Sequence, residues 1–222
     1  MKILFREKRS EWNERFRRPS PYPSLSRTRN IYIIRCKSMP TLDPVPADYL
    51  QGPRLQLRAM EPEDLDFLYQ VENAPESWNV ANLTAPYSRY TIRQYLAAAQ
   101  NDLYVDRQLR LMVTLRQGGE TVGIVDLTDF APQHARAELG VVIAPAYRRQ
   151  GYACEAVGIL CRYAFGPLHL HQVTAHVATD NAASLRVFQA CGFVECGRLR
   201  QWWRTPAGYQ DVVVMQCVHS DY

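Results

Sequence analysis

The sequence has few of the features that mark a metal centre, a disulfide framework or a membrane protein. Its 222 residues include six cysteines and five histidines, with no C-x-x-C unit and no interleaved histidine pattern, so zinc and structural disulfides are poorly supported. Apolar runs long enough to span a bilayer are missing, and the N-terminus is charged where a secretory signal would be apolar. Scattered thiols suit a reducing compartment. We therefore expect a cytoplasmic protein with no metal and no membrane partner.

Positive charge is concentrated near the N-terminus. Residues 1–40 hold 11 Lys and Arg against 3 Glu, whereas the whole chain has a formal net charge of +4, so the remainder is mildly acidic. Arginine, proline and serine dominate much of this region, which is typical of disordered segments. We predict a basic, disordered extension over residues 1–53 and a folded domain over residues 54–222.

The extension has three interpretations. The favoured one is an upstream extension for which Met39 would be the true initiator. A basic tether to nucleic acid or to an acidic surface is the second. An organelle-targeting presequence is the third, and Glu7, Glu11 and Glu14 disfavour it. Nucleic acid is not among the partners that we expect.

The hydrophobic pattern of the remaining chain predicts a mixed α/β domain. Alternating apolar and polar residues mark strands, and apolar residues three and four apart mark helices. The order along the chain is β-α-α-β-β-β-α-β-α-β-β, with a mainly antiparallel sheet. The expected strands cover residues 54–59, 109–115, 121–127, 137–144, 172–178, 193–203 and 210–218, and the expected helices begin near residues 61, 91, 154 and 181.

A basic loop lies between an apolar strand and an apolar helix. Its residues are Arg148, Arg149, Gln150, Gly151, Tyr152 and Ala153. The first amides of a helix have no intrahelical partner, and the helix dipole adds partial positive charge there. Gly151 lets the backbone approach a ligand closely, and the small Ala153 keeps that approach open. This arrangement predicts a phosphate ester as the ligand.

Three separated motifs resemble those of one family. The pattern R-x-x-G-x-A at 148–153 resembles the acyl-CoA pyrophosphate loop of the GCN5-related N-acetyltransferase (GNAT) superfamily. The sequence N-A-A-S at 181–184, followed by G-F at 192–193, resembles the next landmark, and G-Y-Q-D at 208–211 is similar to the last hairpin of the polyamine and ribosomal-protein branches. The resemblance spans about residues 54–218. It implies a GNAT-type, mainly antiparallel central sheet flanked by helices, whose splayed central strands form the acetyl-CoA cleft.

The resemblance also implies how acetyl-CoA, the expected co-substrate, is bound. The backbone of residues 141–143 would pair with the pantetheine amides as an added strand. Amides of residues 149–153 would bind the pyrophosphate, with Arg148 adding positive charge. The residues implied in acetyl-CoA binding are Val141, Val142, Ile143, Arg148, Arg149, Gln150, Gly151, Tyr152, Ala153, Asn181, Ser184 and Phe188.

Acetyl transfer to an amine needs a base for the attacking nitrogen, a donor for the thioester oxyanion and an acid for the leaving thiolate. A backbone amide near Val141 could serve the oxyanion. Many relatives place a tyrosine where this chain has Phe188, which removes the usual acid. The ribosomal-protein branch implicates the serine that matches Ser184, so Ser184 is the predicted acid. The alternative is a helix-start serine that bonds backbone.

The base is sought among other carboxylates, because Trp202 and Trp203 stand where relatives carry a glutamate on the penultimate strand. Asp126 and Glu138 each lie on an otherwise apolar strand, where an unpaired carboxylate is unfavourable. Either could take the amine proton through water or attract a cationic substrate. The alternative is a surface carboxylate or a salt bridge. For His176 a structural role is favoured over a catalytic one.

Aromatic residues could line an acceptor cleft through apolar walls and cation–π contacts, or could simply pack in the core. The candidates are Trp78, Trp202, Trp203 and the tyrosines near Tyr87. The domain resembles spermidine N-acetyltransferases most, although residues 83–89 lack the acidic cluster of those enzymes and contribute Arg89 instead.

We therefore predict an acetyl-CoA-dependent N-acetyltransferase that acts by direct attack in a ternary complex on a spermidine-like polyamine. The alternatives are a protein N-terminal acetyltransferase of the ribosomal-protein type, an antibiotic-modifying acetyltransferase and a non-catalytic acyl-CoA-binding module. The expected partners are a small-molecule amine or a protein N-terminus, and further copies of the chain in a homo-oligomer.

Overall fold

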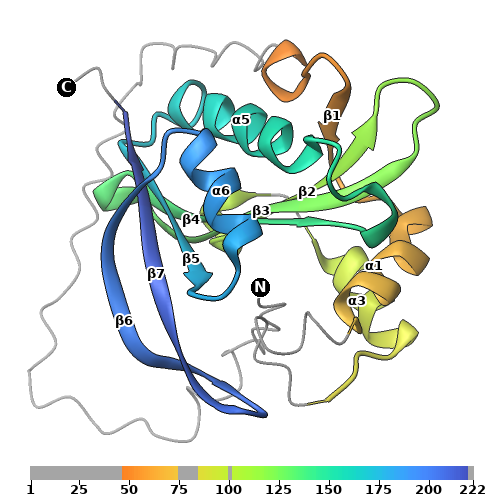
Figure 1. Ribbon diagram of the computed structural model, residues 1–222. Helices are drawn as coiled ribbons and strands as arrows, with labels where there is room; N and C mark the ends of the chain where they lie inside the picture. The colour runs from red at the N-terminus through yellow and green to blue at the C-terminus, as the bar shows by residue number, and fades with distance from the viewer. Residues whose placement is uncertain (1–46, 75–84, 100–101, 220–222) are drawn as a thin grey trace, which may run out of the picture. The chain divides into compact units, whose positions relative to one another are not determined.

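The computed structural model describes residues 47–74, 85–99 and 102–219, and a seven-stranded sheet runs through this part of the chain (Figure 1). The strands lie in the order β1-β2-β3-β4-β5-β7-β6. β4 and β5 pair in parallel, and the other neighbouring pairs are antiparallel. The predicted mixed, mainly antiparallel sheet is confirmed. The strands are β1 (Leu55–Arg58), β2 (Leu109–Leu115), β3 (Thr121–Ala131), β4 (Arg136–Ile143), β5 (Gln172–Ala178), β6 (Val194–Thr205) and β7 (Gly208–Val218).

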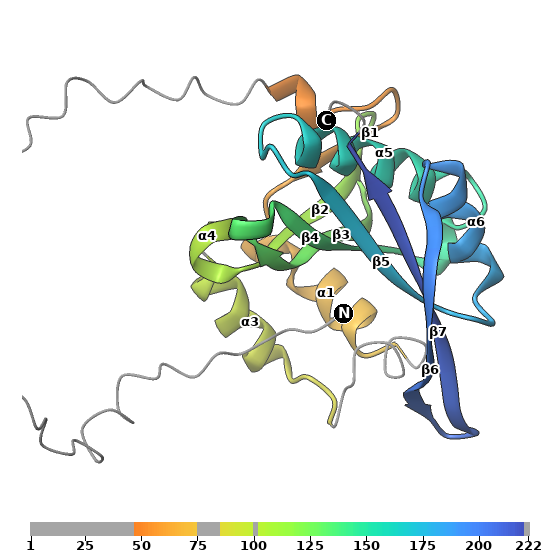
Figure 2. The same cartoon turned by 90° about the vertical axis from the view of Figure 1, so that its left-hand side faces the viewer.

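Helices cover both faces of this sheet. Helices α5 and α6 lie on one face, and α1 and α3 lie on the other (Figures 1 and 2). Buried residues of α5 and the central strands form the larger apolar cluster, and α1 and α3 pack on Met112 and Ile124 in a smaller one. The helices are α1 (Leu65–Glu72), α3 (Arg89–Ala98), α4 (Leu103–Asp106), α5 (Tyr152–Phe165) and α6 (Ala182–Ala190), with 3-10 turns η1 (Ala47–Leu50), η2 (Pro62–Asp64), η3 (Pro132–His134) and η4 (Pro145–Tyr147).

Successive side chains of β2 alternate between the two helix-covered faces of the sheet. Leu109, Leu111 and Val113 belong to the cluster under α5, whereas Met112 belongs to the cluster under α1 and α3, because successive side chains of a strand point to opposite faces. Arg110 lies on the same face as Met112 and is 2% exposed. A charged residue is therefore buried beneath α1 and α3.

The predicted order of elements is confirmed, with local differences. The single turn of α4 is too short for periodicity to reveal; it begins after Asp102, whose carboxylate accepts the Tyr104 N–H at 2.8 Å. β3 continues past the predicted end at residue 127. Its register with β4 shifts between Thr128 and Ala131, and Phe130 in this extension is buried. The helix predicted from residue 61 starts as the turn η2 before α1.

The described part of the chain begins before the predicted domain start at residue 54. The Arg162 guanidinium on α5 donates to the Gln51 carbonyl at 2.6 Å, and the Tyr49 ring lies against Gly166 at the end of α5. Residues 47–53 are thus packed on the domain, while residues 1–46 of the predicted extension, Met39 included, lie outside the described residues. Within the described ranges, none of the helices is long and apolar enough to cross a membrane.

Candidate active site

β4 and β5 pair over a short stretch and then separate. Their parallel pairing joins Arg136–Glu138 to Gln172–Thr174, yet β4 continues to Ile143 and β5 to Ala178. On its other edge, β4 stays paired with β3 as far as Ile143. The edge of β4 that faces β5 therefore lacks a strand partner beyond Glu138, among the residues that the structure describes. Backbone groups at such an edge can accept an extended ligand as an added strand, which is the predicted opening in the sheet.

The loop after β4 leads into the N-terminus of helix α5. Arg149 and Gly151 have φ values of 64° and 82°, and Gly151 is the N-cap residue of the 14-residue helix α5. Left-handed backbone at Gly151 costs little because glycine has no β-carbon. The first-turn amides of α5 have no intrahelical acceptor, and the helix dipole favours an anion there. The geometry fits the predicted phosphate site.

Arg148 binds the end of the strand that precedes it. Its Nε donates to the Ile143 carbonyl oxygen at 2.9 Å. The predicted contacts are those of the Ile143 backbone with the pantetheine and of the Arg148 side chain with the pyrophosphate. In this structure the two predicted groups bind each other, and the Ile143 carbonyl oxygen keeps a second lone pair that a ligand could use.

Helix α6 begins with the second predicted motif. The Asn181 side chain caps the helix by accepting the Ser184 N–H at 3.0 Å, which satisfies one of the free amides of the first turn. Ser184 is half-buried on that turn. Phe188 is 4% exposed and meets the Phe193 ring edge-on, with centroids 5.0 Å apart. Phe188 thus lies in the core, and its assignment to cofactor binding remains a prediction.

Glu138 and His176 meet where β4 and β5 part. Glu138 is paired with Thr174, the last residue of the parallel ladder, and His176 follows two residues later. The carboxylate Oε1 lies 2.9 Å from the imidazole Nδ1, with the side chains 33% and 27% exposed. The hydrogen bond to Glu138 raises the pKa of His176 above its usual value, and burial opposes this. The pair bridges the fork of the sheet while staying accessible to solvent.

Asp126, the other predicted carboxylate, lies in a buried ion network. The Arg110 guanidinium binds Asp126 at 2.6 Å and Glu72 of α1 at 2.7 Å, with all three side chains at most 1% exposed. Burial raises the pKa of Glu72, and its Oε2 has no hydrogen-bond partner among the described residues. The Tyr95 ring centre lies 5.6 Å from the Arg110 Cζ. Since Asp126 is paired and enclosed, Glu138 is the better placed of the two carboxylates.

The predicted acceptor aromatics are distributed over several sites. Trp202 is 58% exposed on β6, Trp203 is half-buried, and Trp78 lies outside the described residues. The backbone of Tyr87 is tied to α1 through Asn73, which accepts the Tyr87 N–H at 2.8 Å and donates to its carbonyl at 3.0 Å. Anchoring of this kind fixes the start of α3 against α1 on the face opposite α5.

Arg89 does not stand as an isolated positive charge. Its guanidinium forms an ion pair with Asp66 of α1 and lies 4.7 Å from the centre of the Tyr69 ring. The cation that distinguishes residues 83–89 from polyamine enzymes is therefore balanced by a carboxylate.

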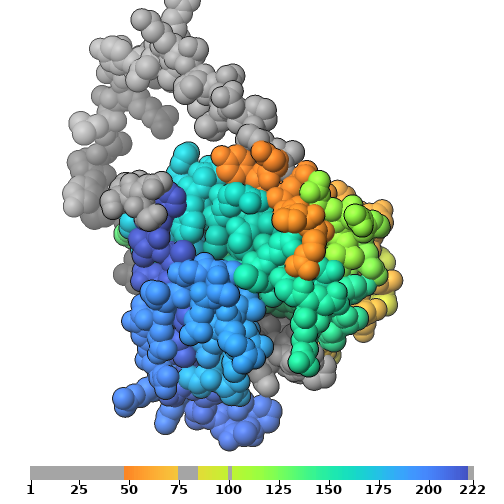
Figure 3. Space-filling view, turned by 45° about the horizontal axis from the view of Figure 1, so that its top comes forward, coloured from red at the N-terminus to blue at the C-terminus, as the bar shows by residue number. Residues whose placement is uncertain are grey.

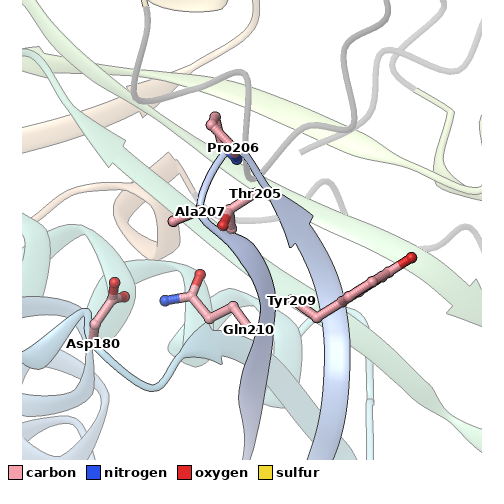
Figure 4. Close-up of a pocket in the computed structure, with 6 residues that line it drawn as sticks. All are labelled: Asp180, Thr205, Pro206, Ala207, Tyr209 and Gln210. Atoms are coloured by element: carbon pink, nitrogen blue, oxygen red, sulfur yellow. The ribbon is translucent and has the colours of Figure 1, made fainter.

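The tip of the β6–β7 hairpin borders a hollow of about 430 Å³. In Figure 4 the side chains of Asp180 and Gln210 point toward each other across it, and Tyr209 points away. The hollow is lined by Asp180, Thr205, Pro206, Ala207, Tyr209 and Gln210. It joins the turn before α6 to the hairpin that carries the third predicted motif.

Known proteins resemble this chain over most of the described domain. A family model described as an acetyltransferase (GNAT) domain matches residues 54–194. A spermidine N(1)-acetyltransferase of Vibrio cholerae is 30% identical over 171 residues, which cover 76% of this chain and 95% of that protein. A Bacillus subtilis protein named as a candidate ribosomal N-acetyltransferase is 26% identical over 172 residues, covering 76% and 93%.

Solved structures agree with the sequence matches. The crystal structure of the Vibrio cholerae spermidine N-acetyltransferase in complex with CoA and spermine has a TM-score of 0.68 and 28% identity, covering 77% of this chain and 99% of that chain. A dodecameric structure of the Vibrio cholerae enzyme has a TM-score of 0.64, with 28% identity over 77% and 97%. Together with the open edge of β4 and the amides at the start of α5, these matches show that the chain belongs to the GNAT family of acyl-CoA-dependent N-acetyltransferases.

Proposed function

We propose that the enzyme transfers the acetyl group of acetyl-CoA to a primary amine by direct attack in a ternary complex, with a spermidine-like polyamine as acceptor. The observation that carries this proposal is the unpaired edge of β4 next to the amides at the start of α5. An edge strand that ends at a helix N-terminus offers backbone hydrogen bonds to the pantetheine and an anion site to the pyrophosphate. The CoA complex of the Vibrio cholerae relative supports the same cofactor.

The Glu138–His176 pair is the proposed proton acceptor. Because Glu138 bonds Nδ1, it fixes the imidazole orientation and leaves Nε2 as the nitrogen that receives the proton of the attacking amine. The amine nitrogen then forms a bond to the thioester carbon, and the oxyanion that develops is stabilised by a backbone amide near Val141. Collapse breaks the carbon–sulfur bond. The Ser184 hydroxyl donates a hydrogen bond or its proton to the departing thiolate, and a proton given in this way is replaced from solvent.

Three considerations support a polyamine acceptor. The ion pair with Asp66 balances the charge of Arg89. The partly exposed Glu138 carboxylate, where β4 and β5 part, can attract a cation. Relatives with 26–30% identity are spermidine acetyltransferases. A protein N-terminus is the second candidate acceptor, supported by Ser184 and by the Bacillus subtilis relative. The dodecameric relative supports a homo-oligomer.

Thiol release from acetyl-CoA tests the function directly. The full-length chain is incubated with spermidine, spermine, aminoglycosides and peptides that have free N-termini, and CoA is measured with a thiol reagent. We expect release above the hydrolysis rate with spermidine and little with the peptides. Calorimetry with CoA is run in parallel. CoA binding without release for any acceptor would favour a non-catalytic module, and release with peptides alone would favour the ribosomal-protein type.

A further inference from the structure

The segment that enters β1 is bonded to the loop that precedes α5. In Figure 3 this segment, in orange, lies directly against α5, in teal. The Arg54 Nη1 donates to the Gln150 carbonyl oxygen at 2.9 Å, and the guanidinium carbon lies 4.8 Å from the centre of the Tyr152 ring. A β-carbon added to Gly151 would meet the Arg54 Nη2 at 3.3 Å. One arginine from outside the loop thus contacts Gln150 and Tyr152 and lies close to Gly151 between them.

Glu155, on the first turn of α5, holds Arg54 in this position. One carboxylate oxygen accepts the backbone N–H groups of Arg54 and Leu55 at 2.8 and 3.0 Å, and the other accepts the Arg54 Nε at 2.8 Å. A β-carbon at Gly52 would lie 2.8 Å from this carboxylate, so the chain passes as closely as glycine allows. Burial alone would raise the pKa of Glu155, but these hydrogen bonds outweigh it and lower the pKa. The Glu155 carboxylate is therefore anionic at neutral pH.

The contact with Gln150 has a geometric consequence for the next amide. In a trans peptide the carbonyl and the following N–H point in opposite directions. Holding the Gln150 carbonyl toward Arg54 therefore aims the Gly151 N–H the other way, away from Arg54. Without the Arg54 contact the loop would tend to change conformation, because Arg149 has a left-handed backbone, which is unfavourable for a residue with a side chain. The amide direction is fixed from outside the anion site.

We propose that Arg54 and Glu155 are positioning residues for the acyl-CoA pyrophosphate. Glu155 holds the guanidinium, and the guanidinium holds the Gln150–Gly151 peptide with its amide turned to the ligand. This inference rests on the proposed function, because it concerns the same cofactor site. It assigns to the start of β1 a role in cofactor affinity that none of the sequence motifs carries.

Arg54→Lys tests the proposal, since lysine keeps the charge but cannot bond Glu155 and Gln150 together through one rigid fork. Calorimetry with CoA and steady-state kinetics with acetyl-CoA are measured on the full-length chain. We expect Kd and KM to rise about tenfold, as for the loss of a charged hydrogen bond, with kcat within about twofold. Turnover of S-acetylpantetheine, which has no pyrophosphate, should be unchanged. Glu155→Gln should raise Kd by a smaller factor, because the amide oxygen still accepts the two backbone N–H groups.

Arg162→Lys is the matched control. Arg162 anchors the same segment to the same helix through the Gln51 carbonyl, but near the other end of α5, and its variant should bind CoA with the wild-type Kd. Equal weakening in Arg54→Lys and Arg162→Lys, or equal losses with acetyl-CoA and S-acetylpantetheine, would reduce the effect to general loosening and overturn the proposal. A wild-type Kd for Arg54→Lys would overturn it while leaving the proposed function intact. Failure of the wild-type chain to bind CoA would remove the proposed function itself.

Discussion

Replacing Arg110 with methionine is expected to destabilise the fold by about 3–5 kcal/mol, the range found when one partner of a buried ion pair is removed. The side chain binds Glu72 and Asp126 at 2.7 and 2.6 Å, and all three groups are at most 1% exposed. Methionine fills much of the same space, but it leaves two carboxylates enclosed without a cation. The Glu72 Oε2 already lacks a hydrogen-bond partner among the described residues, so little in the surroundings can compensate.

The loss is large compared with the stability of an ordinary domain. Native proteins are stable by about 5–15 kcal/mol, and urea lowers this by about 1–3 kcal/mol per M. The urea midpoint of Arg110→Met should therefore fall by at least about 1 M at pH 7, followed by circular dichroism. Glu72→Gln is the matched variant. It keeps an oxygen for Arg110 and removes one of the two buried negative charges, so its stability at pH 7 should stay within about 1 kcal/mol of wild type or rise.

The pH dependence separates charge from packing. Burial raises the pKa of Glu72 above its usual 4.5. A carboxyl with a raised folded pKa adds stability that is fully present below its unfolded pKa and is lost as the pH rises through the folded value. Wild type should therefore gain stability relative to Glu72→Gln as the pH is lowered from 7 to 5. Over the same range, the difference in free energy of unfolding between wild type and Arg110→Met should become smaller. A loss below about 1 kcal/mol for Arg110→Met at pH 7, or a deficit that does not change with pH, would refute the reasoning.

Three further predictions concern the proposed reaction. Ser184→Ala should lower kcat by more than it lowers the affinity for acetyl-CoA, and an unchanged kcat would remove Ser184 as the acid. Arg148→Glu should raise the Kd for CoA by at least about tenfold, because it reverses a charge beside the anion site; a wild-type Kd in calorimetry would contradict the loop assignment. The activity of the wild type should rise with pH through a pKa above 6.5, since the hydrogen bond to Glu138 raises the pKa of His176 and only the neutral imidazole accepts a proton. In Glu138→Gln this inflection should move to lower pH, and an identical pH–rate profile would exclude the pair as the base.

The parts of the fold that could be predicted from sequence are those with strong local patterns. The alternation in β2 and β5 gave strand limits that match the structure, 109–115 and 172–178, because side-chain period alone distinguishes a strand. The loop at residues 148–153 was recognisable because glycine at a helix start has a specific conformational reason, and Gly151 does have a φ of 82°. Such features depend on neighbours in sequence, which a single chain displays directly.

The buried network could not be predicted because its members are far apart in sequence. Arg110 alternates with Leu109 and Leu111, a pattern that predicts an exposed polar face on a strand. Coverage of that face by α1 and α3 turns the same residue into a buried cation. Glu72 carried no distinguishing pattern at all, since a charged residue at the end of a helix is ordinary. The ion network exists only after the helices have packed on the sheet.

The Glu138–His176 contact depends on the register in which β4 pairs with β5. Glu138 stands out in sequence only as a carboxylate on an apolar strand, and a structural role is favoured there for His176. The two residues are separated in the chain by the whole of α5. The parallel pairing of β4 and β5 places Glu138 beside Thr174, two residues before His176, and the imidazole then reaches back to the carboxylate at 2.9 Å. A shift of one residue in that pairing would turn one of the side chains to the opposite face. Tertiary pairing, more than residue type, makes His176 a candidate base.

The two halves of the candidate site are therefore built differently, and this has a consequence for specificity. The cofactor half uses backbone: the free edge of β4, the left-handed turn at Gly151 and the first amides of α5. Apart from Arg148 and the proposed positioning residues Arg54 and Glu155, this half depends on backbone geometry, which tolerates other changes of side chain, so it can be shared by proteins with different acceptors. The proposed acceptor half uses side chains, Glu138 and His176, which meet where β4 and β5 part. Side chains can be exchanged without moving the free edge of β4, so we expect substitutions around this fork to alter the acceptor while leaving the acyl-CoA cleft intact.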